Sequence, residues 1–260
     1  MTATLTGLNA YPLKGGGGTA LRTCELTARG LPFDREFMLA GPEGRFLSQR
    51  DVARMALLRP SYDGEVLTVR APGTAPLVHK AVDDGEVLDV SVHRRDCRGV
   101  DQGDEAAAWF GGLLGRGCRL VRFTGHRATV AGDGELMFAD GFPLLVISAE
   151  SLADLNGRLD DPLPMNRFRP SLVLEGLGPF GEDAARLLRI GETVIETVRP
   201  CARCLVTTTD QRTGERGREP LRTLATYRKA DGKVLFGQNC IPRTLGRITL
   251  GDPVEVLEAR

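Results

Sequence analysis

The chain has 260 residues, and its 34 Lys and Arg residues are balanced by 34 Asp and Glu residues, so the formal net charge is zero. A chain of this length can bury a core without disulfide or metal support, and it is long enough for one large or two modest domains. Zero net charge excludes the global basic field that recruits nucleic acid or anionic membrane, and we expect neither partner.

Six cysteines are spread along the chain: Cys24, Cys97, Cys118, Cys201, Cys204 and Cys240. Disulfide-dense scaffolds are small and secreted, so this spacing in a longer chain favours free thiols. The N-terminus lacks a basic start followed by an apolar run, and no apolar stretch reaches the roughly 20 residues of a spanning helix. We therefore expect a reduced, cytoplasmic protein with no membrane segment.

The first third of the chain predicts strands separated by Gly, Pro and Asp. The runs that carry this pattern are LTGLNAYPL, TCELTARGL, REFMLAG, GRFLSQ and EVLTVRAP. Four successive glycines at 15–18 predict a tight turn where the backbone approaches a neighbour. Residues 101–114 open with acids and carry the apolar side chains Trp109 and Leu113, which predicts a helix.

The second half continues with strands CRLVRF, PLLVISA, SLVLEG and TVIETVRP, and closes on two short strands in ITLGDPVEVLEA. Helices are predicted from Ser148 or Glu150 to near Gly157, at 182–188 and at 219–229. The β-branched run CLVTTTD predicts another strand. Many short strands with few helices favour a barrel over a doubly wound parallel sheet. The polar, Gly-rich stretch at 118–135 is the best seam between domains.

The sharpest motif is Cys201-Ala202-Arg203-Cys204, which is followed by Thr207, Thr208 and Asp210. A thiol–disulfide exchanger would need a helix opening at the first Cys, and the predicted strand does not provide one. A zinc site would need a second Cys or His pair, whereas His79, His93 and His126 are scattered. One thiolate binding a soft, high-valent metal among Arg199 and Arg203 fits the motif better. Two buried structural cysteines remain the plain alternative.

Basic side chains also recur beside turns and strands. Lys14 precedes the glycine run, Arg35 lies in an apolar strand, and Arg50 follows a turn in Ser48-Gln49-Arg50. In Asn166-Arg167-Phe168-Arg169-Pro170, two arginines stand one residue apart and share a side of an extended segment. Because guanidinium forks match phosphate geometry, these groups together suggest a phosphorylated ligand.

Together, these motifs resemble those of the MOSC family, which is named for the C-terminal domain of molybdenum cofactor sulfurase. Its segments resemble that family's motifs in order along nearly the whole chain. They are Tyr11-Pro12-Leu13-Lys14, Asp34-Arg35, Asp140-Gly141-Phe142-Pro143 with Ser151-Leu152-Ala153-Asp154-Leu155-Asn156, Asn166-Arg167-Phe168-Arg169-Pro170, the Cys201–Asp210 signature, Leu235-Phe236-Gly237-Gln238-Asn239 and Gly251-Asp252-Pro253-Val254. The nearest members look like the mitochondrial amidoxime-reducing component and its bacterial counterparts.

The resemblance implies a mixed α+β, β-rich fold, with a MOSC N-terminal β-barrel-like domain at 1–120 and a MOSC domain, itself a β-barrel, at 121–260. It implies a molybdopterin cofactor (molybdenum–molybdopterin) between the two, with Cys204 as the molybdenum ligand. The implied cofactor-binding residues are Lys14, Gly15, Arg35, Asp140, Asn166, Arg169, Arg203 and Asn239, with Arg167 as an alternative to Arg169. Asp210, or an acid near Asp140, would relay protons.

The implied activity is reduction of N-hydroxylated compounds: amidoximes, hydroxylamines or N-hydroxylated bases. The alternatives are a non-catalytic cofactor carrier or persulfide sulfur-transfer module, and a cofactor-free protein in which Cys201 and Cys204 merely pair. Gly15 stands where relatives often carry Ser, and Asn239 where some have Tyr. The chain shows neither a C-terminal ferredoxin Cys cluster nor a mitochondrial-type anchor. Electrons are therefore expected from a separate donor protein, ferredoxin-like or cytochrome b5-like.

Overall fold

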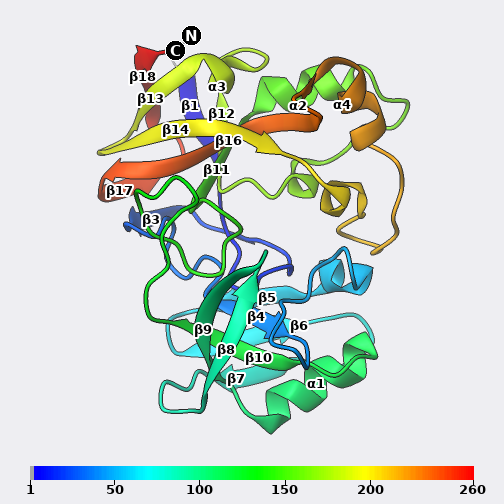
Figure 1. The fold of residues 1–260 in the computed structure, drawn as a ribbon. Helices are drawn as coiled ribbons and strands as arrows, with labels where there is room; N and C mark the ends of the chain where they lie inside the picture. Colours follow the sequence, from blue (N-terminus) through cyan, green and yellow to red (C-terminus); the bar gives the residue numbers. More distant parts are fainter. Residues whose placement is uncertain (1–2) are drawn as a thin grey trace.

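A closed barrel forms the upper half of the molecule in Figure 1, because the outermost strands of its sheet, β11 and β16, pair with each other. The computed structural model describes residues 3–260. Around the ring the seven strands are β11 (Leu144–Ser148), β12 (Leu172–Glu175), β1 (Ala3–Ala10), β18 (Pro253–Ala259), β13 (Ala185–Ile190), β14 (Thr193–Ala202) and β16 (Lys233–Thr244). Two short strands, β2 (Thr19–Ala20) and β15 (Lys229–Ala230), extend the ring at β1 and β16.

Alternation of apolar and polar residues explains how these strands fill the barrel. In β1, Ala3, Leu5, Leu8 and Ala10 are buried while Thr6 is exposed. The side chains that share this core come from almost every strand of the ring and include Val146, Leu172, Leu188, Ile195 and Val254. The period of two is broken in β1 between Leu5 and Gly7, where the register against β12 shifts as in a β-bulge.

The lower half of Figure 1 contains two smaller antiparallel sheets, the helix α1 and the short helix η1. Its first sheet consists of β4 (Phe37–Ala40), β10 (Arg119–Thr124), β9 (Arg95–Asp101) and β8 (Val87–Val92). The second consists of β5 (Arg59–Tyr62), β6 (Val66–Arg70) and β7 (Leu77–Lys80). The helix α1 (Asp104–Leu114) buries Ala106, Phe110 and Leu114 against them, while the short helix η1 (Ala53–Leu57) adds Met55 to the same core.

Short helices lie beside the barrel near β16 in Figure 1. They are α2 (Ala149–Asn156), α3 (Gly181–Ala184), α4 (Leu221–Tyr227) and the single turns η2 (Met165–Arg167) and η3 (Leu205–Thr208). The start of α2 is fixed by Ser148, whose hydroxyl accepts a hydrogen bond from the Ser151 N–H as an N-cap. No helix in residues 3–260 is long and apolar enough to cross a membrane.

The predicted β-rich, mixed α+β fold with a barrel is confirmed, but three local predictions are wrong. Residues 205–208 form η3 rather than a strand, since the hydroxyls of Thr207 and Thr208 bond back to the carbonyls of Cys204 and Leu205. Only the first part of 182–188 is helical, because residues from 185 onward join the barrel as β13. The GRFLSQ run makes only isolated bridges rather than a strand.

The division of the chain at residue 120 stays a prediction, and the strands interleave across it. The strand β1 belongs to the barrel although it opens the chain, and β3 (Thr23–Leu26) pairs with β17 (Gly246–Thr249). Conversely, β10 runs through position 120 within the smaller sheet. The chain therefore passes between the two halves more than once.

Candidate functional site

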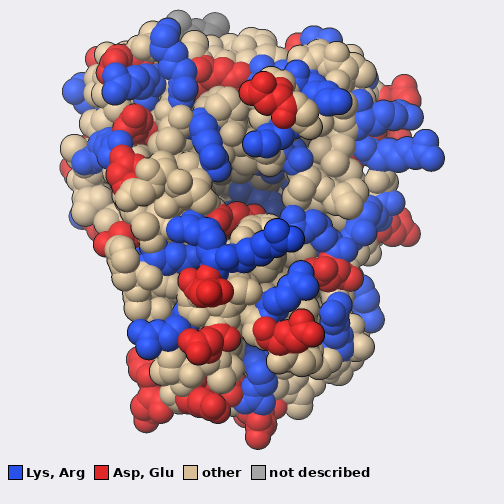
Figure 2. Space-filling model, in the orientation of Figure 1, with Lys and Arg blue, Asp and Glu red and all other residues tan. Residues whose placement is uncertain are grey.

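A cleft opens between the two halves, and Figure 2 shows it as a hollow surrounded by Lys and Arg side chains. One wall comes from the turn after β1, the loop after β4 and the stretch before β11. The other comes from the segment after η2 and from β14 and its continuation. The lining residues that the following argument uses are Lys14, Gly15, Arg35, Phe46, Ser48, Arg50, Asp140, Phe142, Arg169, Cys201, Arg203, Cys204, Thr207 and Asn239.

The cleft is strongly cationic although the chain as a whole is neutral. Its charged lining residues are five cations and one carboxylate: Lys14, Arg35, Arg50, Arg169, Arg203 and Asp140. Charges of one sign inside a low-dielectric hollow reinforce each other's field. The cleft is therefore built to hold a ligand that carries more than one negative charge.

Two of these arginines, Arg35 and Arg169, are anchored on the buried ring of Tyr11. Their guanidinium carbons lie 4.4 and 4.3 Å from its centroid. Both residues have left-handed backbone conformations, with φ of 53° and 56°, which is costly for residues other than glycine. Arg35 also pairs with buried Asp34, and Arg169 donates to the Gly16 carbonyl. Burial lowers the pKa of Arg169 to about 10, so it stays charged at neutral pH.

Lys14 is held in place by Asp140. The Lys14 ammonium is buried, donates to the Phe138 carbonyl at 2.9 Å and forms an ion pair with Asp140. The same carboxylate lies 3.2 Å from His93 Nε2. Burial alone would raise the pKa of Asp140, but Lys14 and His93 together hold it well below its usual range. Asp140 therefore stays ionised and keeps the Lys14 side chain in the cleft.

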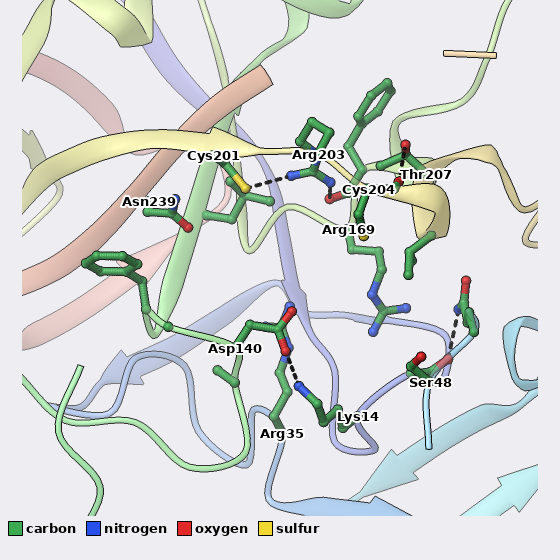
Figure 3. A pocket seen from close by; sticks show the side chains of 18 of the residues that line it. Lys14, Arg35, Ser48, Asp140, Arg169, Cys201, Arg203, Cys204, Thr207 and Asn239 are labelled. Atoms are coloured by element: carbon green, nitrogen blue, oxygen red, sulfur yellow. Dashed lines mark hydrogen bonds and ion pairs between the residues drawn. The ribbon is translucent and has the colours of Figure 1, made fainter. Parts of the chain in front are cut away.

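The two cysteines of the Cys201–Cys204 motif face different ends of the cleft, as Figure 3 shows. Cys204 is exposed, precedes η3 and lies beside Thr207, with its sulfur 4.0 Å from Arg50 Nη1. Cys201 lies nearer Asn239, and its sulfur accepts a hydrogen bond of 3.0 Å from Arg203 Nη1. The prediction of two buried structural cysteines is therefore wrong for Cys204. In residues 3–260 no three His, Cys, Asp or Glu side chains gather as a zinc site would require.

Arg203 has a buried side-chain nitrogen without a hydrogen-bond acceptor in residues 3–260. Its Nη2 donates to the Phe168 carbonyl at 2.5 Å, while its Nε is buried and has no partner among the described residues. Buried donors are nearly always satisfied, so an orphaned N–H in the wall of a cleft indicates a ligand or ordered water.

Most of the predicted site residues meet in this cleft. Those that line it are Lys14, Gly15, Arg35, Asp140, Arg169, Arg203, Cys204 and Asn239. Gly15 is required for its conformation, because its φ is 84° and a Cβ would lie 2.7 Å from the Met55 methyl group. The individual roles of these residues stay predictions.

Two predicted residues lie elsewhere. Asn166 is exposed on η2 and lines a separate hollow behind Tyr11, so the prediction that it binds cofactor has no support in the geometry. Asp210 is also outside the cleft, and both of its oxygens are engaged. One accepts from the N–H groups of Arg212 and Thr213, and the other lies 3.1 Å from Arg167 Nη2. Its carboxylate stabilises a turn, which leaves the predicted proton relay unsupported.

Phe46 was not singled out in the sequence, and Ser48, Arg50 and Thr207 were noted only as parts of a basic stretch and of the cysteine motif, without an individual role in the site. The loop that carries Ser48 and Arg50 reaches the cleft because Gln49 and Gln211 exchange side-chain hydrogen bonds of 3.1 and 3.0 Å across 162 positions of the chain. Gln49 also donates to the Gly15 carbonyl at 2.8 Å. The basic Ser48-Gln49-Arg50 stretch was the available signal, but only the fold shows that it faces Cys204.

Family comparisons agree with this geometry. The chain matches the MOSC N-terminal beta barrel domain over residues 2–117 and the MOSC domain over residues 133–255. It is 33% identical to mitochondrial amidoxime-reducing component 1 of Mus musculus, covering 98% of this chain and 82% of that protein.

This chain is a member of the MOSC family. The human amidoxime-reducing component 1 is 34% identical over 98% of this chain and 83% of its own length. The molybdenum cofactor sulfurase of Oryza sativa subsp. japonica is 35% identical over 87% of this chain but only 31% of its own length. The predicted family membership is therefore confirmed, and the cleft described above lies between the parts that the two domain models match.

Proposed function

We propose that this MOSC protein binds a molybdopterin cofactor in the cationic cleft and reduces N-hydroxylated compounds such as amidoximes, hydroxylamines or N-hydroxylated bases. The observation that carries the proposal is the arrangement of one exposed thiol, Cys204, in a cleft lined by five cations. Thiolates are ligands for soft and high-valent metals, and guanidinium and ammonium groups match phosphate. One cleft thus offers a thiolate for the metal of a molybdopterin cofactor and cations for its phosphate.

The residues present fit this cofactor. Cys204 would ligate the metal, and the orphaned Nε of Arg203 offers a buried donor to the pterin or its phosphate. Lys14, Arg35 and Arg169 would neutralise the phosphate charge. The bound cofactor would supply two-electron oxygen-atom chemistry at the metal, while the protein supplies orientation and electrostatics.

The overall change requires electrons and protons from outside the cleft. In the reduction of R–NHOH to R–NH2, the N–O bond breaks and the oxygen leaves as water, which consumes two electrons and two protons. The chain's relatives are named as components of an amidoxime-reducing system. We accordingly propose a separate one-electron donor protein, ferredoxin-like or cytochrome b5-like. Two of the relatives are named mitochondrial, so the cytoplasmic location stays a prediction.

The test is molybdenum and pterin analysis of the purified protein beside Cys204→Ala and Cys201→Ala variants. We expect wild type and Cys201→Ala to contain molybdenum and Cys204→Ala to lose most of it, because only Cys204 presents a free sulfur to the open end of the cleft. Stoichiometric molybdenum in a folded Cys204→Ala protein would refute the assignment of the ligand.

A carrier or sulfur-transfer role is the second candidate, favoured by the 35% identity to a molybdenum cofactor sulfurase. It predicts cofactor binding without turnover. Reduction of a neutral amidoxime with a chemical electron donor would separate the two candidates, since a carrier leaves the amidoxime unchanged.

A further inference from the structure

Arg50 differs from the other four cations of the cleft in what its side chain contacts. Those four donate to oxygen atoms of the protein: Lys14 to Asp140 and Phe138, Arg35 to Asp34, Arg169 to Gly16, and Arg203 to Phe168. The Arg50 guanidinium has no oxygen acceptor among residues 3–260. Its one polar side-chain contact there is the Cys204 sulfur, 4.0 Å from Nη1.

The position of Arg50 is nevertheless fixed by its backbone and its neighbours. Its N–H donates to Ser48 Oγ at 3.2 Å, and the same hydroxyl donates to Asp51 Oδ2 at 2.8 Å. From the barrel half, Arg216 Nη2 donates to the carbonyls of Gln49 and Arg50, at 2.6 and 3.3 Å. The guanidinium carbon lies 5.7 Å from the centroid of the Phe46 ring, which supports it from one side.

This arrangement places an uncompensated positive charge beside the open end of the cleft. The neighbouring carboxylate of Asp51 is turned to Ser48, and Asp140 is engaged by Lys14 and His93. A molecule that approaches Cys204 therefore meets the Arg50 charge before any compensating acid. A positive potential of this kind attracts anions, and the partly apolar surroundings of Phe46 strengthen it.

We propose that Arg50 is a specificity-determining residue that favours N-hydroxylated substrates bearing a carboxylate or another anionic group over cationic ones. The anionic group occupies the guanidinium fork, and the N–O group then points to the Cys204 end of the cleft. The proposal deepens the function proposed above and rests on it for its substrate class. The reaction itself, with its two electrons from the donor protein and two protons, is unchanged.

The first experiment measures the field at Cys204 without any turnover. The full chain, prepared free of cofactor, is alkylated with iodoacetate, which is anionic, and with iodoacetamide, which is neutral and of similar size. Trypsin cleaves after Arg203, so Cys201 and Cys204 fall in separate peptides that mass spectrometry counts independently. We expect Arg50→Gln to lower the iodoacetate-to-iodoacetamide rate ratio at Cys204 by about tenfold, because the nearest cation is removed.

Matched variants separate charge from structure. Arg50→Lys keeps the charge and should preserve most of the ratio. Arg45→Gln, five residues earlier and outside the cleft lining, should leave the ratio unchanged. Raising the salt concentration should lower the wild-type ratio more than the Arg50→Gln ratio, because the variant lacks the cation nearest to Cys204. An unchanged ratio in folded Arg50→Gln protein would overturn the proposal.

The second experiment uses the cofactor-loaded protein and three benzamidoximes: neutral, para-carboxylate and para-trimethylammonium. In wild type, we expect kcat/KM to be highest for the carboxylate substrate, intermediate for the neutral one and lowest for the cationic one. In Arg50→Gln, the ratio of kcat/KM for the carboxylate substrate to that for the cationic substrate should fall about tenfold or more, mainly through KM. An Arg50→Gln protein that keeps the full wild-type range contradicts the proposal. Absence of turnover with all three substrates would instead refute the proposed reductase, and the alkylation ratio would still decide the role of Arg50.

Discussion

At the scale of single residues, the cleft is assembled by pairing each buried charge before a ligand arrives. Lys14 and Arg35 have carboxylate partners, and Arg169 has a carbonyl partner and the Tyr11 ring. A buried charge without a partner costs several kcal/mol, so these contacts allow a cationic cleft to exist in the ligand-free fold. Arg35 and Arg169 have strained backbones with positive φ angles, and the side chains of both lie over the Tyr11 ring.

The Lys14–Asp140 pair predicts a pH-dependent contribution to stability. Asp140→Asn leaves the buried ammonium with the Phe138 carbonyl as its remaining acceptor, and we expect a loss of about 1–3 kcal/mol at pH 7. Lys14 and His93 outweigh burial and hold the pKa of Asp140 below the value of about 3.9 in an unfolded chain. The contribution is therefore present above about pH 4 and lost as the pH falls through the folded pKa.

Urea unfolding of wild type and Asp140→Asn at neutral and acidic pH measures this difference. The gap between the two proteins should shrink with acidification. A gap of the same size at both pH values would mean that the carboxylate charge contributes nothing and that the asparagine acts through packing.

At the scale of elements, one buried carboxylate ties three segments of the barrel half together. Ser151 Oγ, at the start of α2, lies 2.9 Å from both oxygens of Glu182 in α3, and Ser151 Oγ also accepts from the Phe180 N–H. Ser148 Oγ lies 2.6 Å from the same Ser151 hydroxyl. Glu182 is fully buried and has no cationic partner in the described part of the chain. The Glu182 carboxylate is therefore stabilised by the Ser151 hydroxyl in place of a cation.

This arrangement predicts that Glu182→Gln becomes relatively more stable as the pH rises. Burial raises the pKa of Glu182 above the value of about 4.3 expected in the unfolded chain. As the pH rises through the folded pKa, the unfolded state ionises more readily and wild type loses stability. Glutamine keeps the shape and removes this loss. Thermal or urea unfolding at pH 5 and pH 8 should show a larger advantage for Glu182→Gln at pH 8, and equal differences at both would contradict the argument.

At the scale of the whole molecule, the two halves face each other across like charges. Lys14, Arg35 and Arg50 come from segments beside the smaller sheets, whereas Arg169 and Arg203 come from the barrel half. Their mutual repulsion is relieved when an anion binds between them, and any ligand that binds only the folded state raises its stability.

The cofactor-free protein should therefore be stabilised by sulfate more than by chloride at equal ionic strength. We expect a rise in Tm of about 2–5 °C from sulfate in the cofactor-free protein. The rise should be smaller in the cofactor-loaded protein and in an Arg169→Gln variant. Equal responses of loaded and cofactor-free protein would show that sulfate acts on the general surface and not in the cleft.

The sequence alone determined the barrel-rich fold class, most strand positions, a helix beginning near Ser148 or Glu150 and the likeness of its motifs to the MOSC family. These features depend on the alternation of apolar and polar residues, on helix-capping residues and on the order of motifs, all of which can be recognised from residues close together in the sequence. Residue types also drew attention to the Cys201–Cys204 motif and to the basic side chains beside turns, and the family resemblance then implied Cys204, Lys14, Arg35 and Arg169 in particular.

Only the tertiary structure decided which of the candidates meet. In the sequence, Asp210 and Asn166 looked equivalent to the residues that line the cleft. In the structure, the Asp210 carboxylate accepts hydrogen bonds within the turn at 210–213, and Asn166 lies on η2, outside the cleft. Arg50 reaches the cleft because Gln49 pairs with Gln211 far along the chain, and His93 acts on the cleft only through its contact with Asp140. The β-branched run after Cys204 became η3 because threonine hydroxyls bonded to nearby carbonyls. Contacts between distant segments are set by packing of the whole chain, and local patterns do not encode them.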